Sequence, residues 1–215
     1  MEGTVANGAS FAAVIVAAGS GTRFGRSKHD LLLGGIPLWQ RGIDVLSEAG
    51  IGDVVVVGDV PGGVPGGQRR RDSVLIGLEA FETRPDWVLI HDAARPLITP
   101  DLVRTIIDAS LGSDVDGVVP ALGVTDTIKR VSGDRVVATV DRDDLVAVQT
   151  PQAFRFEVLL TAHHTTPDAA ATDDATLVEL TGGTVAIVEG ERTNMKITYR
   201  GDLVLAESIL EGRRR

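Results

Sequence analysis

Three short segments of the sequence combine glycines with cations or acids in patterns that suit phosphate chemistry. The first is VIVAAGSGTRFGRSK, residues 14–28, where an apolar run enters a loop holding Gly19, Gly21 and Gly25. Glycines let backbone N–H groups approach a ligand closely, and arginines and lysines bind negative charge. We therefore expect this loop to bind a phosphate compound.

The spacing of these glycines, GxGxxxG, is one residue longer than the dinucleotide-binding fingerprint GxGxxG. No helical pattern begins at the third glycine, and Arg23, Arg26 and Lys28 stand where helix packing would want small or apolar residues. A cationic loop suits a triphosphate better than a dinucleotide. The alternative interpretation is an ordinary strand-to-helix turn with solvated cations.

The second segment, GGQRRRDSV, covers residues 66–74. A glycine pair precedes three arginines, and Asp72 and Ser73 follow where a helical pattern begins. Backbone donors and a helix N-terminus would then point at the same spot, which favours an anion site. A solvated basic run is the alternative.

The third segment, HDAARP, runs from His91 to Pro96 directly after the apolar residues Val88, Leu89 and Ile90. A carboxylate that leaves a buried strand at a ligand crevice suits Mg²⁺, which prefers carboxylate oxygen together with substrate phosphate. Asp92 is therefore the predicted metal ligand, and Arg95 could bind a phosphate with two hydrogen bonds. The alternative for Asp92 is a structural residue that caps a turn, and His91 is expected to be a packed or orienting side chain.

Short β-prone runs alternate with helical patterns along the chain. Strands are expected over 12–17, 53–58, 87–91 and 117–120. This βαβαβαβ order predicts a Rossmann-like α/β domain with a mostly parallel sheet, helices on both faces, and ligands at the carboxyl ends of the strands. The helical faces are Leu38, Val45, Leu46 and Ala49; Val74, Leu75, Leu78 and Phe81; and Val103, Ile106, Ile107 and Leu111, with Thr99 as N-cap of the third helix and Pro100 at its first position.

The stretch Asp126 to Asp144 breaks this rhythm, because two β-prone runs flank Ser132-Gly133-Asp134, a plausible hairpin turn. A lone hairpin is marginal in water, so it must lean on the parent domain or on a second subunit. We predict one domain over 1–215, with a leader over 1–11 and a β-arm over 124–145. Later elements are expected as a helix from Phe154 to His163, a helix opening at Thr172-Asp173-Asp174, strands over Val185 to Val188 and Met195 to Thr198, and a terminal helix from Asp202.

The composition narrows the class of protein. The 215 residues are 43% hydrophobic and 24% charged, which is typical of a globular protein with a substantial core. There are no cysteines, so disulfides and thiolate chemistry are excluded, and a reducing cytoplasm is the expected location. The net charge of −9 argues against a nucleic-acid partner, and the longest apolar run, Phe11 to Ala18, is too short to span a membrane.

The ordered motifs resemble those of the 2-C-methyl-D-erythritol 4-phosphate cytidylyltransferases of the non-mevalonate isoprenoid pathway. AAGSGTRFG with the following Lys28, RRDSVLIGL, HDAARP, TDTIKR, TVDR, TPQAF, TDDA and NMKIT occur in the family's order. The similarity spans almost the whole chain, from Ala12 to Leu210.

The resemblance implies transfer of CMP from CTP to the phosphate of methylerythritol phosphate, with release of pyrophosphate and a need for Mg²⁺, with Mn²⁺ as the alternative ion. It implies a homodimer whose arm reaches the neighbouring site, so that Thr127 and Arg142 act in trans. The implied catalytic residues are Arg23, Lys28, Arg142 and Lys196; the implied CTP site is Ala17, Ala18, Gly19, Ser20, Gly21, Arg23, Lys28, Gly67, Arg70 and Ser73; the implied acceptor site is Asp92, Arg95, Thr127, Arg142, Thr150, Thr172 and Lys196.

Elementary chemistry agrees with this implication. A phosphate monoester is mostly a dianion at neutral pH and is already a competent nucleophile, so no general base is required. The site must bring two anions together and stabilise charge at the α-phosphorus, which cations and Mg²⁺ can do. The loop from Gly21 to Lys28 is about two residues shorter than is usual in the family, which could displace the Lys28 ammonium by several ångströms. Arg26 is the alternative cation.

Three other functions stay open at the level of sequence. A cytidylyltransferase for another polyol phosphate, such as ribitol 5-phosphate, would keep the CTP site. An NAD-dependent oxidoreductase would need an acidic residue closing the second strand, and Asp59 falls roughly there, although about 40 rather than about 20 residues after Gly19. A non-catalytic CTP-binding regulator would bind CTP without turnover.

Overall fold

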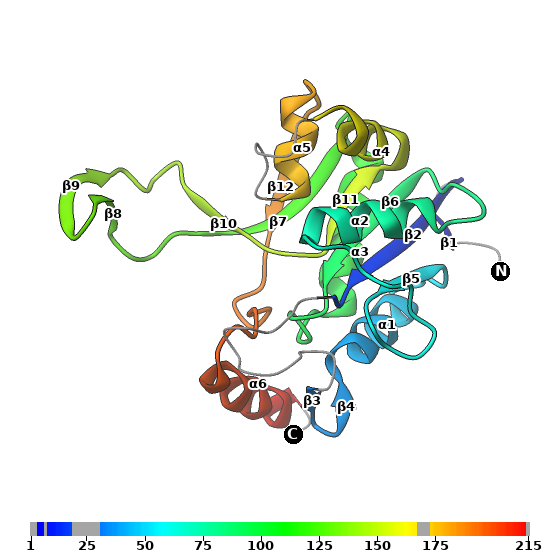
Figure 1. The fold of residues 1–215 in the computed structure, drawn as a ribbon, viewed down its shortest axis with the longest axis horizontal. Coiled ribbons are helices and arrows are strands. Elements are labelled where there is room, and N and C mark those ends of the chain that lie inside the picture. Colours follow the sequence, from blue (N-terminus) through cyan, green and yellow to red (C-terminus); the bar gives the residue numbers. More distant parts are fainter. Residues whose placement is uncertain (1–3, 7, 19–30, 167–172, 214–215) are drawn as a thin grey trace.

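The computed structural model describes residues 4–6, 8–18, 31–166 and 173–213. They form a mixed, mostly parallel β-sheet with helices on both faces, and a long hairpin that extends away from the body (Figure 1). The predicted single α/β fold is therefore confirmed.

The sheet is built around strands that run in the same direction. β2 lies between β5 and β6 with parallel pairing, and β7 pairs in parallel with β12 at the other side of the sheet. The main-sheet strands are β1 (Thr4–Ala6), β2 (Ala9–Val16), β5 (Val54–Val57), β6 (Trp87–Asp92), β7 (Gly117–Gly123), β10 (Val146–Val148), β11 (Gln152–Arg155) and β12 (Val185–Glu189); β3 (Leu32–Leu33) pairs with β4 (Ile36–Pro37), and β8 (Ile128–Ser132) pairs with β9 (Arg135–Val140).

The helices of the described residues cover the two faces of the sheet and one end of it. They are α1 (Leu38–Glu48), α2 (Arg70–Glu79), α3 (Pro100–Gly112), α4 (Phe156–Thr165), α5 (Asp174–Leu180) and α6 (Arg200–Arg213). Each begins close to its predicted position. Thr99 caps α3 as expected, since its hydroxyl accepts a hydrogen bond from the Leu102 backbone N–H at 3.1 Å.

The core has two layers because successive side chains of a strand point to opposite faces. Ala13 and Ile15 of β2 pack with α1 and α3, whereas Val14 packs with α2, α4 and α5 on the other face. The continuous apolar run from Phe11 to Ile15 thus serves both layers, and all five of these side chains are buried.

Two elements differ from the prediction. The helix expected from Phe154 begins at Phe156, because Phe154 and Arg155 belong to β11, which enters the sheet antiparallel between β6 and β7. Its four residues, QAFR, are too few to carry a strand pattern, and α4 follows without an intervening loop. The expected strand over Met195 to Thr198 is wrong, because this segment belongs to no strand of the sheet, and the Ile197 backbone N–H donates to the carbonyl of Ala94 at 2.7 Å.

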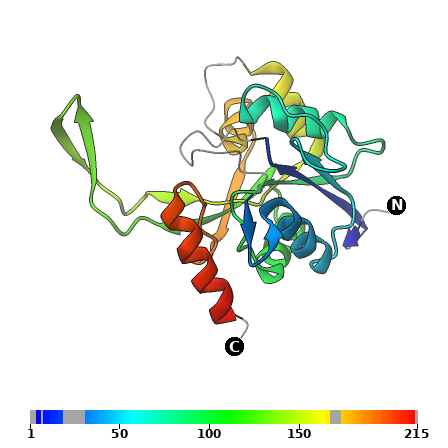
Figure 2. The ribbon, with the colours of Figure 1, turned by 60° about the horizontal axis from the view of Figure 1, so that its bottom comes forward.

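The hairpin β8–β9 and helix α6 lie at the periphery of the molecule, as Figure 2 shows. The hairpin turns at Gly133, whose φ of +59° is readily adopted by glycine. Helix α6 packs Ala206 against Leu31, Leu33 and Ile197. No helix within the described ranges is long and apolar enough to cross a bilayer.

Candidate active site

Most of the predicted site residues that the structure describes lie at one end of the sheet, where the parallel strands have their carboxyl ends. Ala17 follows β2, the loop carrying Gly67 follows β5, Asp92 ends β6, and Lys196 follows β12. β11 runs in the opposite direction, so its start lies at the same edge and brings Thr150 beside the end of β6. The carboxyl ends of the parallel strands thus define the site, as the topology predicts.

Asp92 is held between two cations. Its Oδ1 accepts from Nε of Arg70 at 2.8 Å, and its Oδ2 accepts from Nζ of Lys196 at 2.6 Å. Burial alone would raise the pKa of this carboxyl, but Arg70 and Lys196 outweigh burial and hold the pKa of Asp92 well below its usual range. We call these three residues the Asp92 cluster; in it Asp92 is ionised at neutral pH.

The three consecutive arginines have three different environments. Arg69 is the most exposed of the three and pairs with Asp72 at 2.6 Å, an ion pair in which both side chains are partly exposed. Arg70 faces the site. Arg71 donates to the carbonyls of His163 and Thr166, at 2.7 and 2.6 Å, and so ties α2 to the end of α4.

The start of α2 packs against the strand end that carries Ala17 and Ala18. A Cβ on Gly66 would lie 2.2 Å from Cβ of Ala18 and 3.1 Å from Oγ of Ser73, so only glycine permits this approach. Oγ of Ser73 accepts from the Gly67 backbone N–H at 3.1 Å. The structure thus brings the predicted residues Ala18, Gly67 and Ser73 together around Gly66.

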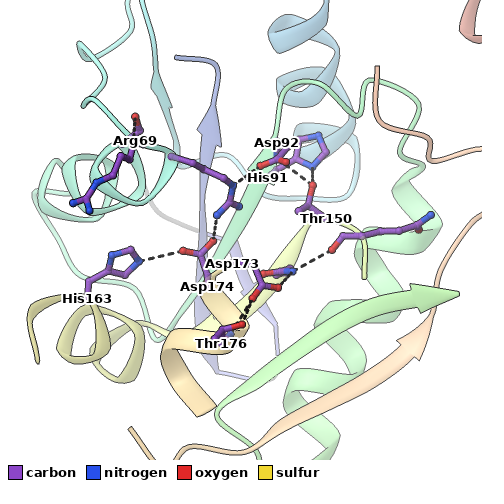
Figure 3. Close-up of polar contacts among 12 residues, drawn as sticks. Arg69, His91, Asp92, Thr150, His163, Asp173, Asp174 and Thr176 are labelled. Carbon is purple, nitrogen blue, oxygen red and sulfur yellow. Dashed lines mark hydrogen bonds and ion pairs between the residues drawn. The ribbon is translucent and has the colours of Figure 1, made fainter. Parts of the chain in front are cut away.

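Thr150 links the end of β6 to the start of β11. Its Oγ1 accepts from the Asp92 backbone N–H at 3.1 Å and lies 3.2 Å from Nδ1 of His91, as shown in Figure 3. Burial lowers the pKa of His91 to about 4. His91 is therefore a neutral, packed side chain, in agreement with the interpretation from sequence.

Arg95 and Lys196 are connected through the segment that follows β12. The guanidinium of Arg95 donates to the carbonyl of Asn194 at 2.8 Å and to that of Val148 at 3.4 Å. Burial lowers the pKa of Arg95. The guanidinium thus contacts backbone carbonyls here, and phosphate binding by Arg95 stays a prediction.

Several predicted residues lie elsewhere. Thr127 and Arg142 are exposed at the base of the hairpin, where Arg142 donates to the carbonyl of Thr125, and neither contacts the Asp92 cluster. The remaining residues of the predicted site lie outside the described residues: Gly19, Ser20, Gly21, Arg23, Lys28 and Thr172. The alternative cation Arg26 does so too.

Sequence reasoning missed an extension of the Asp92 cluster. Nη1 of Arg70 donates to Oδ2 of Asp174 at 2.6 Å, and Oδ1 of Asp174 lies 3.1 Å from Nε2 of His163. The only signal for Asp174 is its place in the TDDA motif, two residues after Thr172. His163 gives none, because a histidine on a helix face reads as a packed residue.

A second missed group holds Lys196 in place. Nε2 of Gln149 donates to the Glu191 carbonyl at 2.8 Å, and Nδ2 of Asn194 donates to the Thr150 carbonyl at 2.9 Å. Asn194 is fully buried. These contacts fasten the segment after β12 to the segment before β11, which places Lys196 beside Asp92.

The site suits a magnesium ion that takes most of its ligands from a substrate. Among the residues described, no three His, Cys, Asp or Glu side chains gather as a ready-made metal site. Mg²⁺ is commonly held by one or two carboxylates together with phosphates and water. The ionised carboxylate of Asp92, whose oxygens each keep a further lone pair, fits that donor set.

The carboxyl ends of the parallel strands gather a buried carboxylate, cations and a glycine-lined helix start, which suits the class of proteins that bind phosphate-bearing nucleotides. Comparison with known proteins narrows this class. Residues 11–212 match the family model of 2-C-methyl-D-erythritol 4-phosphate cytidylyltransferase, and the chain belongs to this family. The resemblance inferred from the motifs is confirmed, and the match favours a nucleotidyltransferase over an oxidoreductase.

The relatives include enzymes of one and of two activities. The chain is 39% identical to the 2-C-methyl-D-erythritol 4-phosphate cytidylyltransferase of Streptomyces avermitilis, over 97% of this chain and 94% of the relative. It is 43% identical to the bifunctional enzyme IspD/IspF of Granulibacter bethesdensis, over 91% of this chain and 55% of the relative. The chain thus spans about half the length of the bifunctional relatives it matches.

Solved structures agree with this assignment. The crystal structure of 2-C-methyl-D-erythritol 4-phosphate cytidylyltransferase from Thermus thermophilus superposes with a TM-score of 0.78 at 32% identity. The match covers 97% of this chain and 99% of that chain.

Proposed function

We propose that this chain transfers the cytidylyl group of CTP to the phosphate of 2-C-methyl-D-erythritol 4-phosphate, giving 4-diphosphocytidyl-2-C-methyl-D-erythritol and pyrophosphate. The observation that carries the proposal is the Asp92 cluster at the carboxyl ends of the strands, in a chain whose family match spans residues 11–212.

The chemistry is a direct displacement. An oxygen of the acceptor phosphate forms a bond to the α-phosphorus of CTP, and the bond from that phosphorus to the pyrophosphate leaving group breaks. The acceptor is mostly a dianion at neutral pH, so no proton has to be removed from it. Catalysis is then positioning and charge stabilisation by cations.

The residues divide into three roles. Arg23 and Lys28 stabilise the charge that develops at the α-phosphorus, while Arg142 and Lys196 orient the attacking phosphate. Gly67, Ser73 and the residues after β2 hold CTP mainly through backbone atoms. The full proposed set is Ala17, Ala18, Gly19, Ser20, Gly21, Arg23, Lys28, Gly67, Arg70 and Ser73 for CTP, and Asp92, Arg95, Thr127, Arg142, Thr150, Thr172 and Lys196 for the acceptor.

Asp92 is the proposed ligand of a divalent cation, Mg²⁺ or Mn²⁺. Such an ion supplies charge neutralisation for the triphosphate when it is bound. Two observations support this assignment: Asp92 is ionised, and Nζ of Lys196 lies beside its carboxylate. A metal ligand and a cation that can bind phosphate thus lie next to each other.

The proposed assembly is a homodimer that acts in the cytoplasm. The hairpin β8–β9 exposes Val131, Val136 and Val137, each more than half exposed, and a lone hairpin has little stability of its own. A partner subunit would cover these side chains and receive Thr127 and Arg142 in its site.

The test is pyrophosphate release from CTP with the purified protein and Mg²⁺, with each of two acceptors. We expect rapid release with methylerythritol phosphate and little with ribitol 5-phosphate. The reverse preference would move the chain to another polyol phosphate, and release with neither acceptor would refute the proposal.

A further inference from the structure

Asp174 contacts Arg70, but it belongs to neither of the substrate sites proposed above. Arg70 is the first residue of α2, Asp174 is the first residue of α5, and their side chains meet at 2.6 Å. The Asp174 side chain is 1% exposed. Placing a carboxylate where water cannot reach it is costly, so it calls for an explanation beyond packing.

The guanidinium of Arg70 is held at two points. Nε donates to Asp92 and Nη1 donates to Asp174, so one side chain bridges the end of β6 and the start of α5. A single contact would let the planar guanidinium pivot about it, whereas two contacts to different elements fix the plane. Burial disfavours the charged form, but the carboxylates of Asp174 and Asp92 outweigh it and raise the pKa of Arg70.

His163 fixes Asp174 in turn, and Figure 3 shows its ring directed at that carboxylate. An ionised carboxylate only accepts hydrogen bonds, so Nε2 of His163 carries the proton that it donates at 3.1 Å. The His163 side chain is fully buried, and Arg71 binds the carbonyl of the same residue. The contacts form one continuous series from α4 through α5 and α2 to the end of β6.

The charges of the two carboxylates and the two cations in this series balance one another. The carboxylates of Asp92 and Asp174 are matched by Arg70 and Lys196. Without Asp174 the group would carry an excess positive charge, and Arg70 would keep only the contact through Nε.

We propose that Asp174 is a positioning residue for cytidylyl transfer, which holds the Arg70 guanidinium against Asp92, and that His163 supports Asp174 in this task. The proposal rests on the proposed function. Asp174 touches no reacting atom, and it acts through Arg70. Outer partners of this kind typically contribute about 10- to 100-fold to activity or metal affinity.

The test is a double-mutant cycle with Asp174→Asn and Arg70→Met, which asks whether the two residues act as one unit. We expect Asp174→Asn to lower kcat about 10- to 100-fold in the wild-type background. In the Arg70→Met background we expect the same change to alter kcat less than about threefold, because the residue through which Asp174 acts is gone. An equal factor in both backgrounds, or no loss in the first, would overturn the proposal.

Asp173→Asn is the matched control. Asp173 caps α5 by accepting from the Thr176 backbone N–H at 3.0 Å, and in the described part of the chain its carboxylate partners are Gln152 and Thr176 rather than Arg70. Asparagine is an equally good N-cap, so we expect kcat to stay within about twofold of the wild type. A loss as large as that of Asp174→Asn would assign the effect to the start of α5 and overturn the specific role of Asp174.

His163 provides a second pair of variants that does not depend on Asp174 itself. Glutamine at position 163 keeps an N–H donor for Asp174, whereas leucine removes it. We expect kcat of His163→Leu to fall and that of His163→Gln to recover most of the loss. Equal losses would exclude the proposed support of Asp174.

A readout without turnover separates this inference from the proposed function. The Nε–H signal of Arg70 in a ¹H–¹⁵N spectrum, assigned by its loss in Arg70→Met, should persist in Asp173→Asn and weaken or shift in Asp174→Asn. An unchanged Arg70 signal in Asp174→Asn would contradict the positioning role, whether or not the wild type turns over CTP. An inactive wild type that shows the expected spectral change would refute only the proposed function.

Discussion

The central residue of the site is Asp92, a carboxylate that stays ionised although it is buried. Its pKa is held low by Arg70 and Lys196, which lie on either side of it. A group of this kind can bind a hard cation and keep an ammonium close to an incoming phosphate. The two cations differ in their surroundings, because the Lys196 side chain is 44% exposed and that of Arg70 is 29% exposed.

Lys196→Ala is the first prediction at this scale. Because Lys196 reaches the site from a partly exposed position, its removal leaves little cavity, and the protein should stay folded. We expect kcat to fall by about 100-fold or more, as on loss of a charge-stabilising donor. Steady-state pyrophosphate release measures the rate, and thermal unfolding checks the fold. Arg104→Ala, which removes an exposed cation of α3, should leave the rate unchanged. A near-normal rate for Lys196→Ala would exclude its proposed role.

Asp86 supports the start of β2 from the residue that precedes β6. Its Oδ2 accepts from both the backbone N–H and the hydroxyl of Ser10, each at 2.7 Å. These hydrogen bonds lower the pKa of Asp86, although burial opposes them. The folded state therefore prefers the ionised form.

Asp86→Asn should reduce the free energy of unfolding by about 0.5 kcal/mol at neutral pH, because Asp86 is exposed and solvent screens its charge. A folded pKa below the unfolded one gives stability that is present above the unfolded value and is lost as the pH falls through the folded value. The difference between wild type and variant should therefore shrink as the pH falls below about 4. Urea unfolding at neutral and at acidic pH measures it, and a difference that grows toward low pH would contradict this assignment.

At the scale of elements, the sequence patterns predicted the strands that are long apolar runs and the hairpin that has a strong turn signal. β2, β5, β6 and β7 were expected because each is a run of apolar residues, and the hairpin was expected from its Ser-Gly-Asp turn. β11 could not be predicted, since four residues directly before a helical pattern carry no strand period. Its pairing depends on the space between β6 and β7, which is a property of the assembled sheet.

The orientation of the site residues likewise depends on the assembled structure. Asp92, Arg70 and Lys196 were expected from the family's motifs, but a run of three arginines does not by itself reveal which one faces Asp92. The helical turn of α2 decides this, because consecutive residues point in directions about 100° apart. Arg70 is thereby turned toward the site while Arg71 is turned toward α4.

Gly77 sets the distance between α2 and the sheet. A Cβ there would lie 2.5 Å from Cγ1 of Val14 and 2.9 Å from Cγ2 of Val57. We expect Gly77→Ala to lower the free energy of unfolding by about 1–3 kcal/mol, because overpacking outweighs the better helix propensity of alanine. Gly112→Ala in α3, where a Cβ would meet nothing within 4 Å, is the control and should be neutral or mildly stabilising. Equal effects of the two changes in chemical denaturation would contradict the close approach.

At the scale of the molecule, the hairpin β8–β9 stands apart from the body that carries the Asp92 cluster (Figure 1). Its sequence predicted a protruding element, since the pattern has too few apolar residues for a core of its own. Thr127 and Arg142 at its base are exposed and contact no residue of the cluster, so the role proposed for them requires the site of a second subunit.

Mixing two inactive variants tests whether the arm acts in trans. Arg142→Ala and Lys196→Ala are each expected to be inactive alone. After subunit exchange, a hybrid dimer would have one intact site, built from the body of one variant and the arm of the other. Random mixing should restore about a quarter of wild-type activity. A mixture no more active than its parents would exclude action in trans.

The central claim is that cations and a divalent ion at the carboxyl ends of the strands let one phosphate displace pyrophosphate from another directly. The most direct measurement is the fate of label from CTP carrying ³²P at the α-phosphorus, in a single turnover with methylerythritol phosphate and Mg²⁺. We predict that the label passes to the diphosphocytidyl product, with none in pyrophosphate and none bound to protein. Label that stays in CTP, or that becomes attached to the protein, would contradict the claim.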